Sequence, residues 1–366
     1  MIFFTIGLPG RFAEWCDRVT ARLAASLGGK VITRTWPSLA DMFGFRPLAS
    51  VLDQVALTLI GEDPDHLVMG IRQPTEQLRT ALAETKAGFV VVLDDPRNAV
   101  ADMISDTNAE VHAVTRTVAN SCASIFRYAT MPEALAIHAD RATHDPAGTI
   151  LSIARHFGIG IGADEANAIL YGLADADVRE IPPGGDDRAG RLPETGRRMV
   201  HGALAAYAEH FVSGSTLGPI TWTRDLFMLA NEPTKRPTDL LDITGDGRIV
   251  IYGPYIHLPA GSWTARITMG LSREAVGCTF LVDASDAGRQ IACTTFIAER
   301  AGVHSTDLFF SLHEPTDRGV EIRVAVASNN ARGHLAFGNV LLRRLGVHDP
   351  AAVAEAQDDF KIALEL

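Results

Sequence analysis

The sequence predicts an α/β domain built on a parallel sheet, followed by an all-β domain of the jelly-roll or β-sandwich type. Three observations lead to this fold class. Up to about residue 215, short apolar runs alternate with longer segments of helical spacing. Gly88–Leu93 (GFVVVL) is a continuous apolar run of the kind found in buried parallel strands. Beyond residue 240, short strand candidates follow one another at regular spacing, with turn-rich pieces between them.

The first half alternates strands with helices, which predicts a parallel sheet covered on both faces. Ile2–Ile6 and Val31–Thr33 are strand candidates that precede the Gly88–Leu93 run. Phe12–Leu27 has helical spacing, and Gly28 and Gly29 follow it as a stop signal. Further helical patterns cover Ala99–Ser105, Val111–Tyr128, Pro146–Phe157, Asp164–Leu173 and Arg197–His210.

The second half has no helical pattern until its end. Its strand candidates are separated by the pieces LPAGS, DASDAG, HEPTDRG and SNNARG, which are rich in turn-forming residues. This pattern of short strands separated by turns is typical of an antiparallel sandwich. The strand candidates are Ile249–Tyr252, Trp263–Met269, Cys278–Val282, Gln290–Phe296, Asp307–Leu312, Val320–Ala327 and Leu335–Leu342.

Composition shifts divide the chain. Val178–Arg198 is rich in Pro, Gly and charge and is predicted to be a surface loop. A second break at about Ser215–Pro237 contains the piece TKRP. We therefore predict an α/β domain over 1–215, a linker over 216–240, a β-sandwich over 241–346, and a short acidic amphipathic helix within 347–366.

The overall composition excludes several classes of protein. Of 366 residues, 47% are hydrophobic and 21% charged, which excludes collagen-like, disulfide-scaffold and wholly disordered chains. The formal net charge of -11 argues against a nucleic-acid partner, because binding to a phosphate backbone depends on clustered Lys and Arg. The charge does not argue against a neutral partner such as a sugar.

Cysteines and apolar runs suggest a reducing, non-membrane setting. Four scattered cysteines without a CxxC pair favour buried free thiols over zinc ligands, although a Cys278–Cys293 bridge between neighbouring predicted strands stays open. We expect no bound metal. The start, MIFFTIGLPG, lacks the basic region of a secretory signal, and no apolar run is long enough to cross a bilayer. A soluble, cytoplasmic protein is expected.

Three turns in the first half could carry chemistry, and each also has a purely structural interpretation. The Gly7–Trp15 segment turns from a strand into a helix, where backbone N–H groups can hold an anion. In the structural interpretation of the same segment, Glu14 simply stabilises the helix dipole. Asp94–Asn98 follows the strongest strand, where ligands bind, but Asp95 or Asn98 is equally suited to cap a helix. Gly61–His66 offers a carboxylate and a histidine as general base, or a solvated loop before a helix.

The order of these pieces resembles the bacterial sulfotransferase family, whose members transfer a sulfuryl group from 3'-phosphoadenosine 5'-phosphosulfate to a hydroxyl. The resemblance covers about residues 1–212 and implies a fold related to P-loop NTPases. Four segments carry it: GLPGRFAEW for the family's phosphosulfate loop, GEDP for its acidic-Lys-x-Pro motif, VVLDDPRNAVADMI for its Arg-Asp-Pro-Arg-Asp segment, and HADRATHDPAGTILSIARHFGI for its Asp-Pro loop and helix.

This chain departs from the family where the family binds phosphate. Asp63 stands where the second motif has Lys, and Asp94 and Asp102 stand where the third has a phosphate-binding Arg and Ser. A carboxylate in place of such an Arg forfeits a charge-assisted hydrogen bond worth about 1.5–3 kcal/mol and adds repulsion. The nucleotide site is therefore expected to be eroded, with no cofactor bound. In the loop, the family's basic and hydroxyl residues are replaced by Gly10, Arg11, Phe12, Ala13 and Glu14.

The second half resembles sandwich modules of bacterial polysaccharide-related enzymes that look like carbohydrate-binding domains. The segment DITGDGRIVIYGPYIHLPAGSWTARITM carries this resemblance, which covers about residues 240–346. Sugar sites need an aromatic platform and planar polar side chains. Trp263 is also suited to the core, and the SNNARG piece to an ordinary turn. The candidate carbohydrate-binding residues are Tyr255, His257, Trp263, Asn329, Asn330 and Arg332.

Together these features predict a sulfotransferase-like protein without sulfuryl transfer that binds a glycan, or assists other proteins of bacterial polysaccharide biosynthesis. An active sulfotransferase acting on a carbohydrate hydroxyl is the alternative. It would use the 3'-phosphoadenosine 5'-phosphosulfate donor, with Glu62 or His66 taking the hydroxyl proton. A non-catalytic scaffold is the second alternative. In the active enzyme the donor would be held by Gly7, Pro9, Gly10, Arg11 and Arg97.

Overall fold

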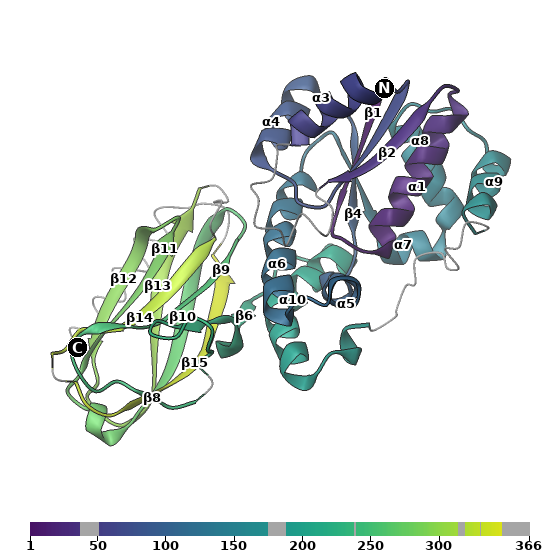
Figure 1. Ribbon diagram of the computed structural model, residues 1–366. Coiled ribbons are helices and arrows are strands. Elements are labelled where there is room, and N and C mark those ends of the chain that lie inside the picture. The colour runs from purple at the N-terminus through teal and green to yellow at the C-terminus, as the bar shows by residue number, and fades with distance from the viewer. Residues whose placement is uncertain (37–50, 175–187, 238, 314–318, 330, 346–366) are drawn as a thin grey trace. The chain divides into compact units, whose positions relative to one another are not determined.

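The computed structural model describes residues 1–36, 51–174, 188–237, 239–313, 319–329 and 331–345 (Figure 1). The chain divides into two compact units. The first comprises Met1–Glu110, Ser121–Leu192 and Tyr207–Ser215, and the second comprises Val111–Asn120, Pro193–Ala206 and Thr216–Leu366. The fold class predicted from the sequence is confirmed, because a parallel α/β sheet occupies the N-terminal half and antiparallel sheets occupy the C-terminal half.

The first unit contains a five-stranded sheet whose strand pairs are all parallel, in the order β2-β3-β1-β4-β5. Two of the strands were not predicted from the sequence. One of them, β3, follows the Gly61–His66 segment, which was expected to precede a helix. The strands are β1 (Ile2–Gly7), β2 (Val31–Trp36), β3 (His66–Ile71), β4 (Phe89–Leu93) and β5 (Ala134–His138).

Helices cover both faces of this sheet, as Figure 1 shows. On one face, α1, α8 and α9 pack on the sheet through a core that includes Phe3, Val19, Ile150 and Ile153, all fully or almost fully buried. The helices are α1 (Arg11–Ser26), α3 (Val51–Glu62), α4 (Glu76–Thr85), α5 (Pro96–Thr107), α6 (Val111–Tyr128), α7 (Ala139–His144), α8 (Pro146–His156), α9 (Ala163–Ala174) and α10 (Glu194–Ser213).

The second unit is a sandwich of two antiparallel sheets. One has the order β13-β10-β15-β6, with β8 also pairing β15, and the other has the order β12-β11-β14-β9-β7. Side chains alternate between buried and half-buried positions along the strands, as in β14. The strands are β6 (Ile220–Trp222), β7 (Met228–Leu229), β8 (Leu241–Asp242), β9 (Arg248–Ile256), β10 (Gly261–Leu271), β11 (Thr279–Asp286), β12 (Arg289–Ile297), β13 (Gly302–Leu312), β14 (Val320–Val326) and β15 (His334–Arg344).

The range predicted as a linker contains strands. β6 pairs with β15 and β7 pairs with β9, so 220–229 adds an edge strand to each sandwich sheet. The second unit also takes segments from the first half of the chain. Gly202 of α10 lies so close to β6 that a Cβ there would stand 2.7 Å from the Thr221 carbonyl oxygen. A composition shift marks turns, but it does not show which sheet a short strand joins.

Other expectations fall partly outside the described residues. The predicted loop Val178–Arg198 is described only from Arg188, where a short 3₁₀ helix (Arg188–Arg191) precedes α10, and the predicted C-terminal helix lies outside the described residues altogether. All four cysteines are free thiols, so Cys278 and Cys293 are not bridged. Among the described helices, none has the length and apolar run that crossing a membrane requires. The described ranges also bring no three His, Cys, Asp or Glu side chains together as a metal site.

Candidate functional sites

The turn after β1 begins the segment that was matched to the phosphosulfate loop of the resembled family. β1 and β4 run in parallel with Gly7 beside Val92, so their carboxyl ends meet at one edge of the sheet. A Cβ on Gly7 would stand 2.8 Å from the Cβ of Val92, which explains the glycine. Leu8 is buried, and Gly10, with φ 153°, precedes α1 without a side-chain cap. The first N–H groups of α1 therefore begin at this edge.

A carboxylate of the protein itself lies beside this turn. Asp102 of α5 has its Oδ2 atom 3.6 Å from where a Cβ of Gly10 would be. It forms an ion pair with Arg188, and both side chains are largely buried, at 14% and 7% exposure. The backbone N–H of Arg188 also donates to Asn98 Oδ1 at 3.2 Å. The space next to the start of α1 thus contains an internal anion, held by an internal cation.

Asp94 adds a second carboxylate at the same edge. It directly follows β4, and its Oδ1 atom accepts a hydrogen bond from the N–H of Asp95 at 2.7 Å. Burial raises the pKa of Asp94 to about 6, because the loss of water outweighs that hydrogen bond and the attraction of Arg188. A phosphate here would add negative charge beside a carboxyl group whose pKa the charges of Asp95 and Asp102 also raise.

The two arginines assigned to the donor in the active alternative are placed differently. Arg11, the first residue of α1, is exposed. Arg97 makes a two-pronged ion pair with Asp95, whose carboxylate also accepts from the Arg97 backbone N–H at 2.9 Å. Asp95 is therefore the cap of α5, which is the structural interpretation of this segment. The charges of Asp95 and Arg97 therefore balance each other within the turn. Pro9 is buried.

Glu62 and His66, the candidate bases, lie at the other edge of the sheet. Glu62 ends α3 and pairs with Arg34, and His66 begins β3, with its Nε2 atom 2.9 Å from the Gly28 carbonyl oxygen. The six residues of β3 span about 17 Å at a strand's rise per residue. The structure therefore does not bring these two side chains to the turn at Gly7.

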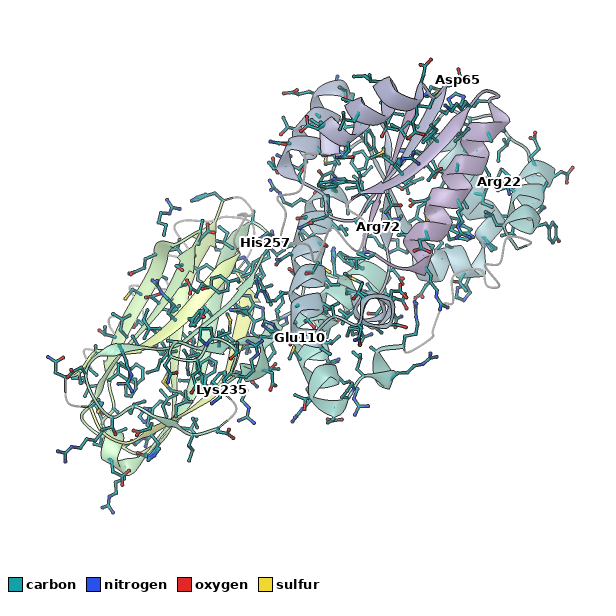
Figure 2. The ribbon with its side chains drawn as sticks, in the orientation of Figure 1. Arg22, Asp65, Arg72, Glu110, Lys235 and His257 are labelled. Atoms are coloured by element: carbon teal, nitrogen blue, oxygen red, sulfur yellow. The ribbon has the colours of Figure 1, made fainter. Side chains whose placement is uncertain are left out.

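A buried ion pair that sequence reasoning missed lies inside the same unit, and Figure 2 labels one of its members, Arg72. Asp17 of α1 pairs with Arg72, which follows β3, and both side chains are at most 5% exposed. Thr5 of β1 donates to the same carboxylate. Burial raises the pKa of Asp17, although Arg72 and Thr5 oppose the shift. The only sequence signal is a charged residue on the apolar side of α1, and its partner lies 55 residues away.

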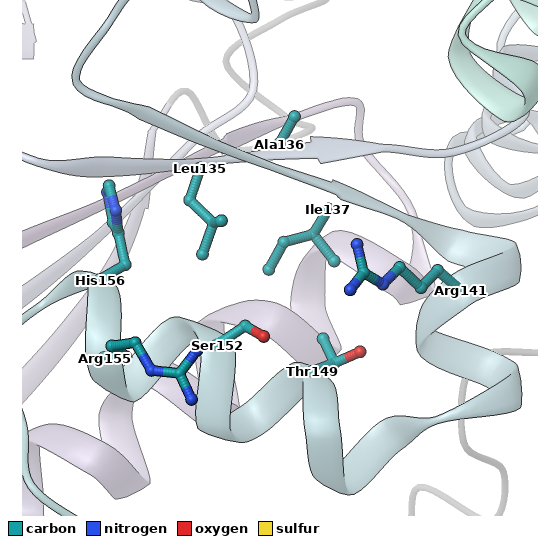
Figure 3. Close-up of a pocket in the computed structure, with 8 residues that line it drawn as sticks. All are labelled: Leu135, Ala136, Ile137, Arg141, Thr149, Ser152, Arg155 and His156. Carbon is teal, nitrogen blue, oxygen red and sulfur yellow. The ribbon is translucent and has the colours of Figure 1, made fainter.

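A small pocket lies between β5 and α8 (Figure 3). It has a volume of about 300 Å³ and is formed by β5 together with part of the fourth segment of the sulfotransferase resemblance, which begins at His138. Leu135 and Ile137 of β5 line it, while α8 contributes hydroxyl groups whose bonds go to the helix backbone, as for Ser152 and the Gly148 carbonyl oxygen. Asp145 caps α8 by accepting from the Gly148 N–H. The pocket is lined by Leu135, Ala136, Ile137, Arg141, Thr149, Ser152, Arg155 and His156.

The predicted carbohydrate residues do not gather in one place. Trp263 is fully buried and donates to the Pro259 carbonyl oxygen, so it belongs to the sandwich core. Tyr255 and His257 lie where β9 meets the start of β14. Asn329 and Arg332 follow the other end of β14, about 20 Å along its seven residues, and both are exposed. Asn330 lies outside the described residues.

The sandwich has a larger groove that the sequence did not indicate. This β12–β13 groove has a volume of about 770 Å³, within the usual range of ligand sites. At its wall the ring of His304 stacks on that of Phe296 at an interplanar angle of 21°, and Phe296 in turn stacks at 18° on Phe280, which is fully buried beneath it. The Nε2 atom of His304 lies 2.8 Å from the Arg300 carbonyl oxygen, which fixes the outermost ring. The groove is lined by Thr279, Thr294, Thr295, Phe296, Ile297, Glu299, Arg300, His304, Ser305 and Thr306.

Comparison with known proteins gives no match in sequence, either to a protein-family model or to a curated protein. Solved structures with related folds exist. A mouse sulfotransferase complexed with PAP superimposes with a TM-score of 0.39 at 10% identity, over 54% of this chain and 79% of that one. A CBM36 domain of a xylanase from the hindgut metagenome of Trinervitermes trinervoides gives 0.25 at 9%, over 35% and 99%. An arabinose-bound α-L-arabinofuranosidase gives 0.24 at 12% over 31% of this chain, which spans only 20% of that enzyme. Structural neighbours thus include sulfotransferase folds and carbohydrate-related modules.

Proposed function

We propose that this protein binds a glycan through the β12–β13 groove and does not transfer sulfuryl groups. The observation that carries the proposal is the groove itself, in which a fixed aromatic ring stands among hydroxyl groups and a Glu299–Arg300 pair of charged residues. Sugars bind by laying an apolar face on a ring while their hydroxyls bond to polar side chains around it. The groove offers both kinds of contact in one concave surface.

The charges at the turn after β1 support the second part of the proposal. The Asp102–Arg188 pair beside Gly10 already supplies the negative charge that α1 attracts at its start, and Asp94 adds another carboxylate close by. A phosphosulfate would have to displace or approach these groups. The α/β unit then serves an accessory role in the same chain as a sugar-binding sandwich, in keeping with assistance to polysaccharide synthesis.

The groove is tested by affinity electrophoresis of the full chain through gels containing xylan, dextran, alginate or carboxymethyl cellulose. We expect retardation by at least one polysaccharide. His304→Ala should abolish it, since this change removes the outermost ring, while the matched control His334→Ala changes an exposed histidine outside the groove and should behave like the wild type. Equal retardation of both variants would refute the groove as the site. No retardation in any gel would favour the scaffold function.

The donor part has a separate test. Adding 3'-phosphoadenosine 5'-phosphate at millimolar concentration should leave the melting temperature unchanged, because a ligand raises it only when it binds the folded state. A saturable rise of the melting temperature would overturn this part of the proposal and favour the active sulfotransferase alternative.

A further inference from the structure

One face of α6 packs on the sandwich, entirely within the second unit. His112, Arg116 and Asn120 are spaced four residues apart and therefore lie on one side of the helix. The Nε2 atom of His112 lies 3.3 Å from the Leu226 carbonyl oxygen, and Asn120 Oδ1 accepts from the His257 N–H at 2.7 Å. Between them, the Arg116 guanidinium lies over the ring of Tyr255, 5.7 Å from its centre.

A second arginine approaches the same face. The Nη2 atom of Arg236 is 3.2 Å from His112 Nδ1. A guanidinium can only donate, so Nδ1 is the acceptor and the ring proton sits on Nε2, which donates to the Leu226 carbonyl oxygen. Burial and the two nearby arginines lower the pKa of His112 to about 4. At neutral pH this histidine is uncharged and serves to orient Arg236.

Arg116 and Arg236 therefore form a cationic pair that lacks a counterion. Among the described residues neither arginine forms an ion pair with a carboxylate. Arg116 Nε and Arg236 Nη1 are buried donors without a hydrogen-bond acceptor in that part of the chain. Burial lowers the pKa of Arg116, and the charge of Arg236 lowers it further. Each unsatisfied buried donor is costly, so such pairs normally have an anion between them.

The carboxylate that contacts Tyr255 already has two hydrogen-bond donors. Glu321 accepts from the Tyr255 hydroxyl at 2.7 Å and from Ser285 Oγ at 2.9 Å, one bond to each oxygen. It holds the tyrosine ring in place beneath Arg116, and the ring face offsets part of the positive charge. The remaining charge is left for a ligand to balance, together with the guanidinium donors that have no acceptor among the described residues, Arg116 Nε and Arg236 Nη1.

We propose that Arg116 and Arg236 bind an oxyanion, namely a sulfate, phosphate or carboxylate group that is either a free ion or a substituent on a larger ligand. The planar guanidinium fork matches the oxygens of such groups and forms two parallel charge-assisted bonds. The start of α6 adds a favourable dipole, since His112 is the second residue of this helix. The site lies in the second unit and does not depend on the glycan function proposed above.

Calorimetric titration of the full chain with sodium sulfate and sodium phosphate tests the site, with total ionic strength held constant by sodium chloride. We expect saturable binding by the wild type. Arg116→Gln and Arg236→Gln should each weaken it by at least about tenfold, the equivalent of one charge-assisted hydrogen bond. Arg289→Gln, which alters an exposed arginine of the same sandwich, is the matched control and should bind like the wild type.

Folding of the variants is controlled with Arg116→Lys, which keeps the charge but loses the two-pronged geometry. A folded Lys variant should bind more weakly than the wild type and more tightly than the Gln variant. Comparing a sulfated disaccharide with its desulfated counterpart then separates the two sources of the anion. Binding of the free ion alone, or tighter binding of the sulfated sugar, supports the site. Absence of saturable binding by any of these probes, or equal binding by Arg116→Gln and the wild type, overturns it.

Discussion

Asp102 and Arg188 lie 86 residues apart in the chain and form an ion pair beside Gly10, where α1 begins. This pair links α5 to the short helix before α10, and it puts a carboxylate at the position where an incoming phosphate would seek backbone N–H groups. Its contribution to stability and its effect on the neighbouring turn can be measured separately.

Removing one member of this pair should lower the free energy of unfolding more than removing both members. Arg188→Ala leaves Asp102 largely buried without its cation, and we expect the free energy of unfolding to fall by about 3 kcal/mol. Asp102→Ala/Arg188→Ala should recover part of that loss, because no uncompensated charge is left. Urea denaturation of the two single variants and the double variant gives the coupling. Additive losses would show that the two charges do not interact.

Asp94→Asn should stabilise the protein at neutral pH. Because the pKa of Asp94 is raised to about 6 by burial, its ionised form costs stability above that pH, and the cost disappears below the unfolded value of about 4. The amide can keep the hydrogen bond from Asp95. We expect a gain of about 1–3 kcal/mol at pH 7.5 that vanishes by pH 4, measured by urea denaturation. A gain that is independent of pH would contradict the assignment.

His112 should produce the opposite pH dependence. Its pKa is lowered to about 4 in the folded state, so the unfolded chain binds the proton more tightly, and stability falls as the pH drops from about 6.5 to 4. His112→Asn keeps a side-chain acceptor for Arg236 and does not titrate. Thermal unfolding at several pH values should show up to about 3 kcal/mol less acid sensitivity in this variant. Parallel curves for wild type and variant would refute the prediction.

Gly70→Ala should be strongly destabilising, by about 2–4 kcal/mol, because the new methyl group would meet the Asp17 carboxylate. That carboxylate cannot move aside, since Thr5 and Arg72 hold it. The control is Gly61→Ala in the last turn of α3, where a Cβ meets nothing within 4 Å and a gain of about 0.5–1 kcal/mol is expected. Similar effects of the two changes would mean that the Asp17–Arg72 pair does not restrain β3.

Periodicity was sufficient for the fold class and failed for particular strands. β4 was predicted because five apolar residues run together, and burial on both faces requires that pattern. β3 contains Gly70, which weakens a strand signal and is there to admit Asp17. β5 reads ALAIH, and its alanines favour a helix, so pairing with β4 determines its conformation. Neither cause is visible in a local window.

The candidate sites show the same limit. Asp95 as a helix cap could be predicted, because the cap and the helix start lie within a few residues. The Asp102–Arg188 pair and the Arg116–Arg236 pair each join segments that are distant in the chain, and the β12–β13 groove depends on how two consecutive strands lie against each other. Their charges and rings are ordinary one at a time, and only the tertiary fold brings them together.

Helix α6 limits how the sandwich could be exchanged between proteins during evolution. Its first ten residues belong to the second unit, and its remaining residues belong to the first. Excising the sandwich at residue 216 would strip the Leu226 carbonyl, the Tyr255 ring and the His257 N–H of their partners. A gene cassette encoding the sandwich alone would thus transfer an incomplete surface. Recombination could exchange this unit between proteins only together with a host helix that carries matching side chains.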